Sequence, residues 1–284
     1  MVQLHRFSSR GLRHFWLYPL VALGVALGLI MGAPTRTQAF PWGDLLRQGI
    51  EVIRLSTISD RQEVALGQQI NRELVGRKIR LYENPALTRY INRLGRQLAA
   101  NSDRPNLPYR FQVVADRSIN AFATMGGFVY VNTGLLRAAD NEAQLASVLA
   151  HEIGHISSRH AVEQLRKAAL EKGIATVAGL EDSRLVSLGV DLAINRPGSR
   201  QNELEADQKG LVMLKRSGYA PIAMVDFLKK LQAERSIPSF LSTHPATAAR
   251  IIALQQAIDP ATASQGEGLD GLAYKRQLLS LLES

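Results

Sequence analysis

The sequence predicts an α+β fold that is mainly helical and carries one small sheet. Apolar residues recur at helical spacing along most of the chain, whereas residues 109–134 are rich in β-branched and aromatic residues. The order of helices, strands and helices argues against a doubly wound fold. With 284 residues, 46% of them hydrophobic, the chain can bury one core of ordinary domain size and still carry extensions.

The first 39 residues are typical of a targeting segment. Three arginines precede the uncharged run FWLYPLVALGVALGLIMGA, the order found in secretory signal peptides. Ala39 suits the last position before cleavage, but the run is nearly long enough to span a membrane, so an uncleaved amino-terminal anchor is the alternative. In either case we expect the rest of the chain outside the cytoplasm, in the periplasm or cell envelope, with contact to the membrane surface possible.

The remaining elements follow from periodicity and from residues typical of helix ends. The stretches YRFQVVA and SINAFATMGGFVYVNTG predict short strands, with a break at Gly126 and Gly127. Asn141 and Gln144 resemble a capping box, and Ser199 is a suitable N-cap. Helical spacing predicts these helices in chain order: a lead-in over 40–80, an amphipathic helix over 84–101, helices after Asn141 and after Ser199, two near 222–235 and 245–258, and a short helix in the tail 259–284.

The composition limits the chemistry that the chain can perform. There is no cysteine, so disulfides and thiolate metal sites are excluded, and any metal must be held by His, Asp or Glu. The net charge is +9, but no block of basic residues and no interleaved aromatic residues accompany it. A nucleic-acid partner is therefore not expected, and the oligomeric state is not determined by the sequence.

The stretch SVLAHEIGHISSRH, residues 147–160, contains half of the six histidines in the chain. On a helix, His151 and His155 lie on one face beside an apolar stripe, and Glu152 lies within that stripe. Burying a carboxylate is unfavourable without compensation, so this position suggests a function. HEIGH matches H-E-x-x-H, in which two histidines bind zinc and the glutamate activates water. His160 would lie far around the same helix, so we expect it to be structural.

A third metal ligand must come from another part of the chain. The extended motif H-E-x-x-H-x-x-G-x-x-H would need Gly and His at positions held by Ser158 and Ala161. A later helix carries Glu203 and Asp207, four residues apart on one face. We expect Glu203 to complete the metal site and Asp207 to hydrogen-bond His151. The alternative for these acidic residues is a solvated helix face.

Several ordered motifs resemble one family of zinc metallopeptidases. The family is of the gluzincin type and includes HtpX, the CAAX prenyl proteases, the mitochondrial Oma proteases and the periplasmic BepA proteins. The resemblance covers roughly residues 60–258. It rests on these segments: NAFATMGGFVYVNTGLL (120–136), HEIGHISSRH (151–160), ELEAD (203–207) and STHPATAAR (242–250), the last of which resembles the periplasmic branch.

The resemblance implies a zincin-like domain over residues 81–258, with a small sheet packed on the HExxH helix. It also implies one bound Zn²⁺ and the following roles: His151, His155 and Glu203 as ligands, Glu152 as general base and acid, and Asp207 as the hydrogen-bond partner of a ligand.

Other residues are expected near this site. His244 would either stabilise the oxyanion or occupy the open zinc position as a latch, and its alternative is an ordinary loop histidine. Arg250 would hold that loop in place or stabilise the charge that develops during the reaction. The alternative for Arg250 is an ordinary surface salt bridge. The segment Asn120, Ala121 and Phe122 would pair with an extended substrate, or form an ordinary buried strand.

Two departures from the family pattern narrow the expected function. Met125 stands where many relatives have proline, which affects the local turn and no catalytic role. We see neither a carboxyl-terminal helical-repeat domain nor a multi-span membrane core, which argues against processing of prenylated peptides. The segment 173–198 would form a lid, a membrane-touching flap or ordinary packed helices.

The function that the sequence favours is a zinc-dependent metalloendopeptidase acting on unfolded or misassembled extracytoplasmic proteins. A second hypothesis is a latent, protease-like chaperone or assembly factor for envelope proteins, with His244 blocking the zinc. A hydrolase of cell-wall or lipid amides is a third reading, which nothing beyond the zinc motif supports.

Overall fold

The computed structural model describes these parts of the chain: residues 58–172, 183–195, 198–234, 236–245 and 248–283. All of them belong to one compact unit, Leu46–Ser284. The predicted leader and the first part of the helical lead-in lie outside the described residues. So does part of the segment that we expected to be a lid or flap.

The expected α+β class is confirmed, since the described residues are mainly helical and contain a three-stranded sheet. The strands are β1 (Arg110–Val114), β2 (Ala121–Thr124) and β3 (Phe128–Asn132). The helices are α3 (Asp60–Arg77), α4 (Pro85–Ala99), α5 (Thr133–Ala138), α6 (Glu142–Ser157), α7 (His160–Glu171), α8 (Ser183–Asn195), α9 (Arg200–Arg216), α10 (Ile222–Gln232), α11 (Ser239–Thr243), α12 (Ala248–Ala257) and α13 (Gly271–Glu283).

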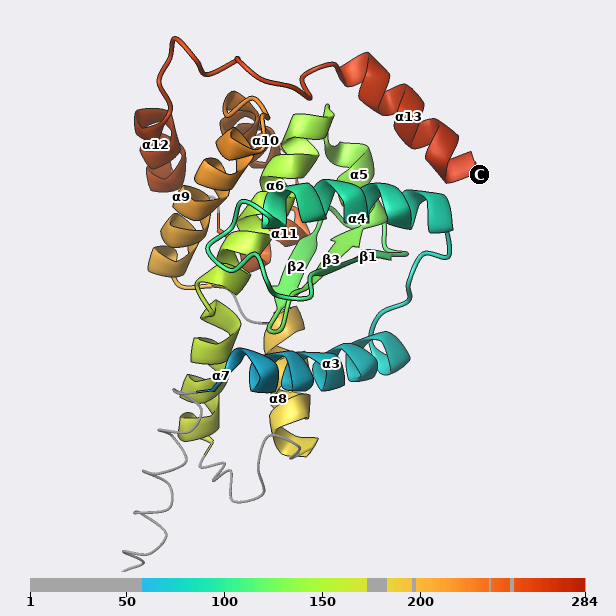
Figure 1. The fold of residues 1–284 in the computed structure, drawn as a ribbon, viewed down its shortest axis with the longest axis vertical. Helices are drawn as coiled ribbons and strands as arrows, with labels where there is room; N and C mark the ends of the chain where they lie inside the picture. The colour runs from blue at the N-terminus through green and yellow to red at the C-terminus, as the bar shows by residue number, and fades with distance from the viewer. Residues whose placement is uncertain (1–57, 173–182, 196–197, 235, 246–247, 284) are drawn as a thin grey trace, which may run out of the picture. The chain divides into compact units, whose positions relative to one another are not determined.

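Helix α6, which carries the HEIGH motif, lies at the centre of this unit (Figure 1). It packs against α4, α9, α10 and the sheet, and nearly all of its side chains are buried. Asn141 caps its start by accepting a hydrogen bond from the Gln144 backbone N–H at 2.9 Å. The expected capping box is only half formed, because the Gln144 side chain accepts from the Asp140 N–H instead. Asp140, in the loop before the helix, therefore replaces Asn141 as the backbone donor to the Gln144 side chain.

Small residues let α6 and α9 approach closely. A Cβ at Gly154 of α6 would lie 2.6 Å from the carbonyl oxygen of Ala206, and a Cβ at Gly210 of α9 would lie 3.1 Å from the backbone nitrogen of His151. Neither position could carry a larger side chain without separating the helices. These two glycines therefore form a close helix contact, which brings the acidic residues of α9 onto α6.

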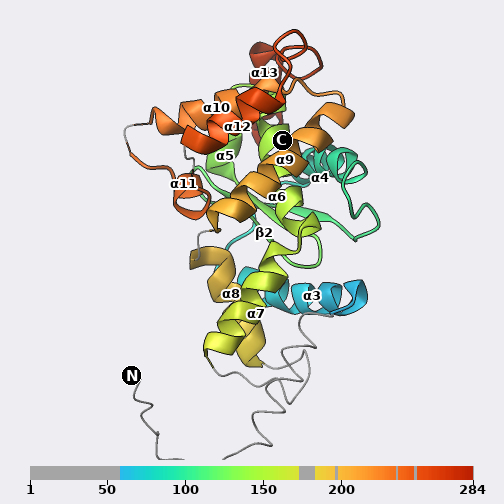
Figure 2. The same ribbon diagram turned by 90° about the vertical axis from the view of Figure 1, so that its left-hand side faces the viewer.

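The sheet has the order β1-β3-β2, so β2 is an edge strand. Strand β1 runs parallel to β3, whereas β2 is antiparallel to β3 with Phe122 opposite Tyr130. Gly126 and Gly127 adopt φ angles of 77° and 94° in the turn between β2 and β3, a conformation that favours glycine. Figure 2 shows β2 beside α6, and the two elements are in contact. The expected packing of a small sheet on the HExxH helix is therefore confirmed.

The expectation that the active helix continues through His160 is wrong. Helix α6 ends at Ser157, and α7 begins at His160 after Arg159, whose φ of 59° is left-handed. A non-glycine residue in this region is strained by roughly 1 kcal/mol. Arg159 is held there by its side chain, which donates to a Glu63 carboxylate oxygen at 2.9 Å and to the Ile58 carbonyl at 2.8 Å.

Glu63 of α3 is the centre of a buried polar network. Its side chain is 1% exposed and accepts hydrogen bonds from Arg104, from Arg159 and from the backbone N–H of Gly126. Arg104 also donates to the carbonyl oxygen of Ile156 near the end of α6. The network thus connects α3, the turn of the edge strand and the break after α6.

We expect Glu63→Ala to lower the free energy of unfolding by about 3 kcal/mol, because the backbone N–H of Gly126 loses its acceptor and two arginines keep only the exposed carboxylate of Asp60. This is the lower end for breaking a buried pair, since the Arg159 side chain is 35% exposed. Glu73→Ala on the same helix removes an exposed pair with Arg77 and should lower it by less than about 0.5 kcal/mol. Urea unfolding of both variants measures the difference, and equal losses would contradict a structural role for the Glu63 network.

The carboxyl-terminal part packs onto the same unit. In α13 the Tyr274 hydroxyl donates to the Leu136 carbonyl at 2.7 Å, while Asn84 donates to the Leu281 carbonyl.

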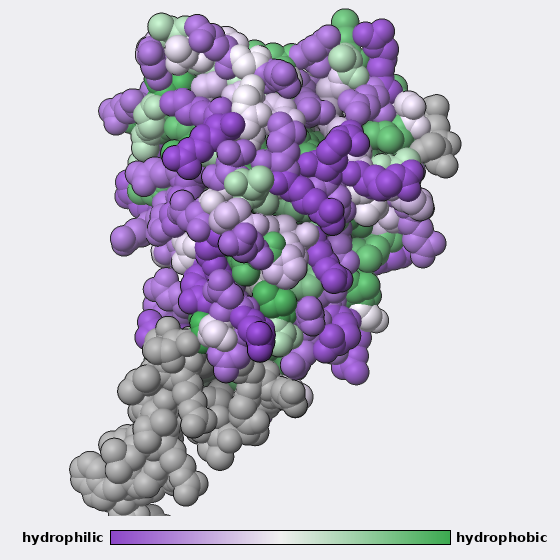
Figure 3. Space-filling model, viewed as in Figure 1, coloured by the Kyte–Doolittle hydropathy of each residue, from purple (hydrophilic) through white to green (hydrophobic). Residues whose placement is uncertain are grey.

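Hydrophilic side chains cover most of the face shown in Figure 3, with separate apolar areas between them. Among the described helices, none has the length and apolar character needed to cross a membrane.

Candidate metal centre

Two imidazoles of α6 converge on a carboxylate of α9. His151 and His155 are one helical turn apart, and their Nε2 atoms lie 3.1 Å from each other. The two oxygens of Glu203 lie 3.4 Å from these nitrogens, one oxygen facing each ring. Glu203 is in reach because the glycine contacts described above draw α9 onto α6. The sequence hypothesis that joined these three residues therefore agrees with the geometry.

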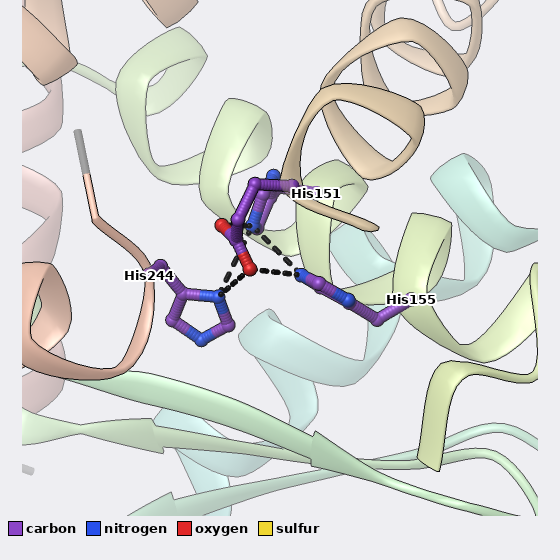
Figure 4. Close-up of side chains that lie close together, drawn as sticks. His151, His155 and His244 are labelled. Atoms are coloured by element: carbon purple, nitrogen blue, oxygen red, sulfur yellow. Dashed lines mark hydrogen bonds and ion pairs between the residues drawn. The ribbon is translucent and has the colours of Figure 1, made fainter. Parts of the chain in front are cut away.

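The same cluster contains His244, which follows α11. Figure 4 shows the rings of His151, His155 and His244 pointing toward one another. His244 Nδ1 lies 3.3 Å from His151 Nε2 and 3.3 Å from a Glu203 oxygen. One possible ligand atom from each of the four residues lies within 4.8 Å of the other three. The structure thus brings His244 to the position of a fourth ligand.

The chemistry of these donors fits a metal ion. His151 Nδ1 lies 2.9 Å from an Asp207 oxygen, and an ionised carboxylate only accepts, so this nitrogen carries the proton. In its neutral form His151 therefore presents the lone pair of Nε2 to the lone pair of His155 and to Glu203. Such an arrangement of electron-rich atoms requires a cation between them or a bound proton. Histidine and carboxylate donors, in a chain without cysteine, suit Zn²⁺.

The charges of the cluster perturb its ionisation. Burial alone would lower the pKa of His151, but hydrogen bonds with Asp207 and Glu203 outweigh it and raise the pKa to about 9. Burial and the neighbouring His151 hold the pKa of His155 well below its ordinary value. Burial would raise the pKa of Glu203, but the hydrogen bonds with His151 and His244 hold it far below its usual range. The carboxylate is therefore ionised and available as a ligand.

Arg250 of α12 holds the carboxylates in place. It donates to both oxygens of Asp207, at 2.6 and 2.7 Å, and to Glu203 at 2.9 Å. It also donates to the carbonyl oxygens of His244 and Pro245. The side chain is 1% exposed, so the alternative of a surface salt bridge is wrong. These contacts steady the His244 loop and the acidic residues of α9.

Glu152 is buried next to the cluster without a hydrogen bond. Within the described part of the chain neither carboxylate oxygen has a hydrogen-bond partner, and the residue is 0% exposed. One oxygen lies 3.5 Å from Nε2 of His244. Burial raises the pKa of Glu152, although the nearby His244 and His151 lower it. A buried carboxylate with free lone pairs beside a metal cluster can accept a proton from water.

Residues 85–258 match the description of Peptidase family M48. The chain belongs to peptidase family M48. It is 38% identical to the beta-barrel assembly-enhancing protease of Escherichia coli (strain K12) over 213 residues, which are 69% of this chain and 44% of the relative. It is 28% identical to the metalloprotease LoiP of Escherichia coli (strain K12) over 243 residues, 81% of this chain and 92% of that protein.

The mitochondrial metalloendopeptidase OMA1 of Schizosaccharomyces pombe is 30% identical over 179 residues, 60% of this chain and 52% of that protein. The chain spans less than half the length of the assembly-enhancing proteases that it matches. The family resemblance inferred from the motifs is confirmed, and the M48 match covers the whole cluster from α6 to α12.

A cleft opens beside the ligand cluster of His151, His155, Glu203 and His244. Its volume is about 760 Å³, which includes its open mouth. Its walls include Phe122 of the edge strand β2, Glu152 and His155 of α6, and Leu192 of α8. Helix α8 is the described part of the segment 173–198. It lines the cleft and packs on α3 and α7. Ala121 and Phe122 are themselves buried, and the side-chain oxygen of Asn120 is buried without a hydrogen bond in the described residues.

Sequence reasoning missed the contacts that three residues make beside the ligand cluster. Glu63 and Arg159 line the cleft, and His160 Nδ1 lies 2.9 Å from His155 Nδ1. Helical periodicity could not find these contacts, because they depend on the left-handed residue between α6 and α7. The signal that could have indicated these contacts is the pair Arg159 and His160, which follows the HEIGH motif within five residues.

Proposed function

We propose that this chain is a zinc-dependent metalloendopeptidase that hydrolyses peptide bonds of extracytoplasmic proteins. The observation that carries the proposal is the buried Glu152 carboxylate, which has no hydrogen-bond partner among the described residues and lies beside the ligand cluster on the wall of the cleft. A structural zinc site has no need of such a group, because its ligands already satisfy the ion. A hydrolytic site needs it as a base.

One Zn²⁺ per chain would be held by His151, His155 and Glu203. When bound, zinc acts as a Lewis acid that lowers the pKa of water toward neutrality and polarises a carbonyl group. Asp207 holds the Nδ1 proton of His151 and so directs Nε2 toward the ion. Arg250 keeps both α9 carboxylates ionised and in place.

Glu152 would act as general base and then as general acid. It takes a proton from the attacking water and delivers it to the leaving nitrogen of the scissile bond. Burial raises the pKa of Glu152 above the usual carboxylate value, which makes it a stronger base. The edge strand β2, with Asn120, Ala121 and Phe122 at its start, would align an extended substrate along the cleft.

The substrates that suit this cleft are unfolded or misassembled proteins. Pairing with an edge strand requires an extended backbone, which folded proteins seldom expose. The basic and apolar leader supports export to the periplasm or cell envelope, and several relatives are called beta-barrel assembly-enhancing proteases. Contact with the membrane surface is a further part of this proposal.

The second candidate function is a latent, protease-like chaperone or assembly factor. The position of His244 favours it, since Nδ1 of this residue lies where a fourth ligand would close the site. A closed site hydrolyses no peptide until His244 moves away. The two candidate functions therefore differ in one respect. In the peptidase the fourth ligand position is open to water and substrate, whereas in the latent protein His244 occupies it.

Removal and return of the metal test the proposal. We expect the full-length chain to bind one Zn²⁺, to cleave an unfolded protein such as reduced casein, to stop when zinc is chelated and to recover when zinc is restored. Zinc content and cleavage are measured on the same samples. Cleavage that persists at undetectable zinc would contradict a zinc mechanism, and a zinc-loaded chain without activity would favour the latent function.

A further inference from the structure

We propose that His160 is a positioning residue that holds the metal-facing orientation of His155. It would accept a hydrogen bond from the Nδ1–H of His155 and donate one from its own Nε2–H to Glu205. This inference rests on the proposed metal site, in which His155 is a ligand. His160 does not reach the cluster of ligand atoms itself, so its role is separate from metal coordination.

The contact between the two histidines is direct and buried. The Nδ1 atoms are 2.9 Å apart, the rings stand at 70° to each other, and His160 is 3% exposed. On its other side His160 Nε2 lies 3.4 Å from a Glu205 oxygen. The second oxygen of Glu205 accepts from the Ser158 hydroxyl at 2.7 Å. Both nitrogens of His160 thus face a partner.

The required tautomers follow from these partners. His155 presents Nε2 to Glu203 and His151, so a neutral His155 that binds a metal there must carry its proton on Nδ1. That proton points at His160 Nδ1, which must then be the acceptor. Neutral His160 is left with its proton on Nε2, facing the Glu205 carboxylate, which can only accept. Every proton in this chain of contacts has one consistent position.

The two ligand histidines are therefore supported differently. His151 donates to the Asp207 carboxylate, the usual arrangement for a metal-bound imidazole. His155 has no carboxylate at that distance in the described residues, and a second imidazole takes this place. The break in the helix makes this possible, because Arg159 in its left-handed conformation turns His160 back toward α6.

The affinity of the full-length chain for Zn²⁺ tests the inference. Competition with a chromogenic chelator should give an affinity about 10- to 100-fold lower for His160→Leu, the usual effect of losing such a partner. His160→Asn places an amide oxygen near the position of Nδ1 and should recover most of the affinity. Lys167→Leu also introduces a leucine side chain, but at an exposed position of helix α7, and it should bind zinc like the native chain.

A second measurement needs no variant and so does not depend on how His160→Leu folds. Long-range ¹H–¹⁵N spectra of the zinc-loaded chain, labelled at histidine nitrogens, should show His160 protonated at Nε2 and bare at Nδ1. A proton on Nδ1 of His160 would overturn the inference, as would a folded His160→Leu variant with native zinc affinity. A native chain that binds no zinc would instead overturn the proposed metal site, together with this role of His160.

Discussion

Glu152→Gln should lower the rate of peptide cleavage between about 10² and 10⁴-fold while the variant still binds one Zn²⁺. The amide keeps the shape of the side chain but cannot take a proton from water. Zinc binding should persist, because Glu152 is not among the residues whose ligand atoms converge. Removing a buried charge that has no hydrogen-bond partner in the described residues should also leave the fold at least as stable.

The measurement compares cleavage of an unfolded protein by the native chain, by Glu152→Gln and by Glu83→Gln. Glu83 is exposed on the segment between α3 and α4, so the same chemical change there controls for any general effect. A zinc-loaded Glu152→Gln variant that cleaves at the native rate would show that Glu152 is not the base. A variant that loses zinc as well would make the activity loss uninformative about proton transfer and would instead place Glu152 among the metal-holding residues.

His244→Ala should raise the rate of cleavage by about tenfold or more. In the structure the imidazole lies at the fourth ligand position, so the site opens only when this residue moves away. If the open form is a minor state, populated below about 10%, permanent opening raises the competent fraction by at least that factor. Three proposed ligands stay in place, so the variant should still bind zinc.

Thr243→Ala is the matched control for this loop, because it changes the preceding residue and leaves the imidazole intact. Cleavage is measured at equal zinc content for the native chain and both variants. A lower rate in His244→Ala with full zinc content would contradict the latch. It would favour the role of His244 in stabilising the oxyanion, which the sequence left open.

The local signals in the sequence were enough to predict the central helix and its partner. Asn141 and Ser199 accept backbone hydrogen bonds at the starts of α6 and α9, as expected from cap residues. Gly218, with a φ of 84°, follows the end of α9. These features depend on hydrogen bonds within three or four residues, so the sequence alone determines them.

Contacts between distant segments were less accessible. Arg250 is buried among carboxylates of α9, whereas a surface salt bridge was one of the roles considered for it from the sequence. Glu63 on α3 fixes the left-handed Arg159, almost one hundred residues later in the chain. No periodicity reports such pairs, because each depends on how whole helices pack.

Motifs and local spacing were enough to infer the family, the mainly helical α+β class and the candidate donor residues of a metal site, because helical spacing and cap chemistry are local properties. The packing of distant segments was needed to show that His244 lies within reach of Glu203 and that His160 contacts His155. The first depends on the position of the loop after α11, which Arg250 holds. The second depends on one left-handed residue, whose strain is offset by an ion pair with another helix.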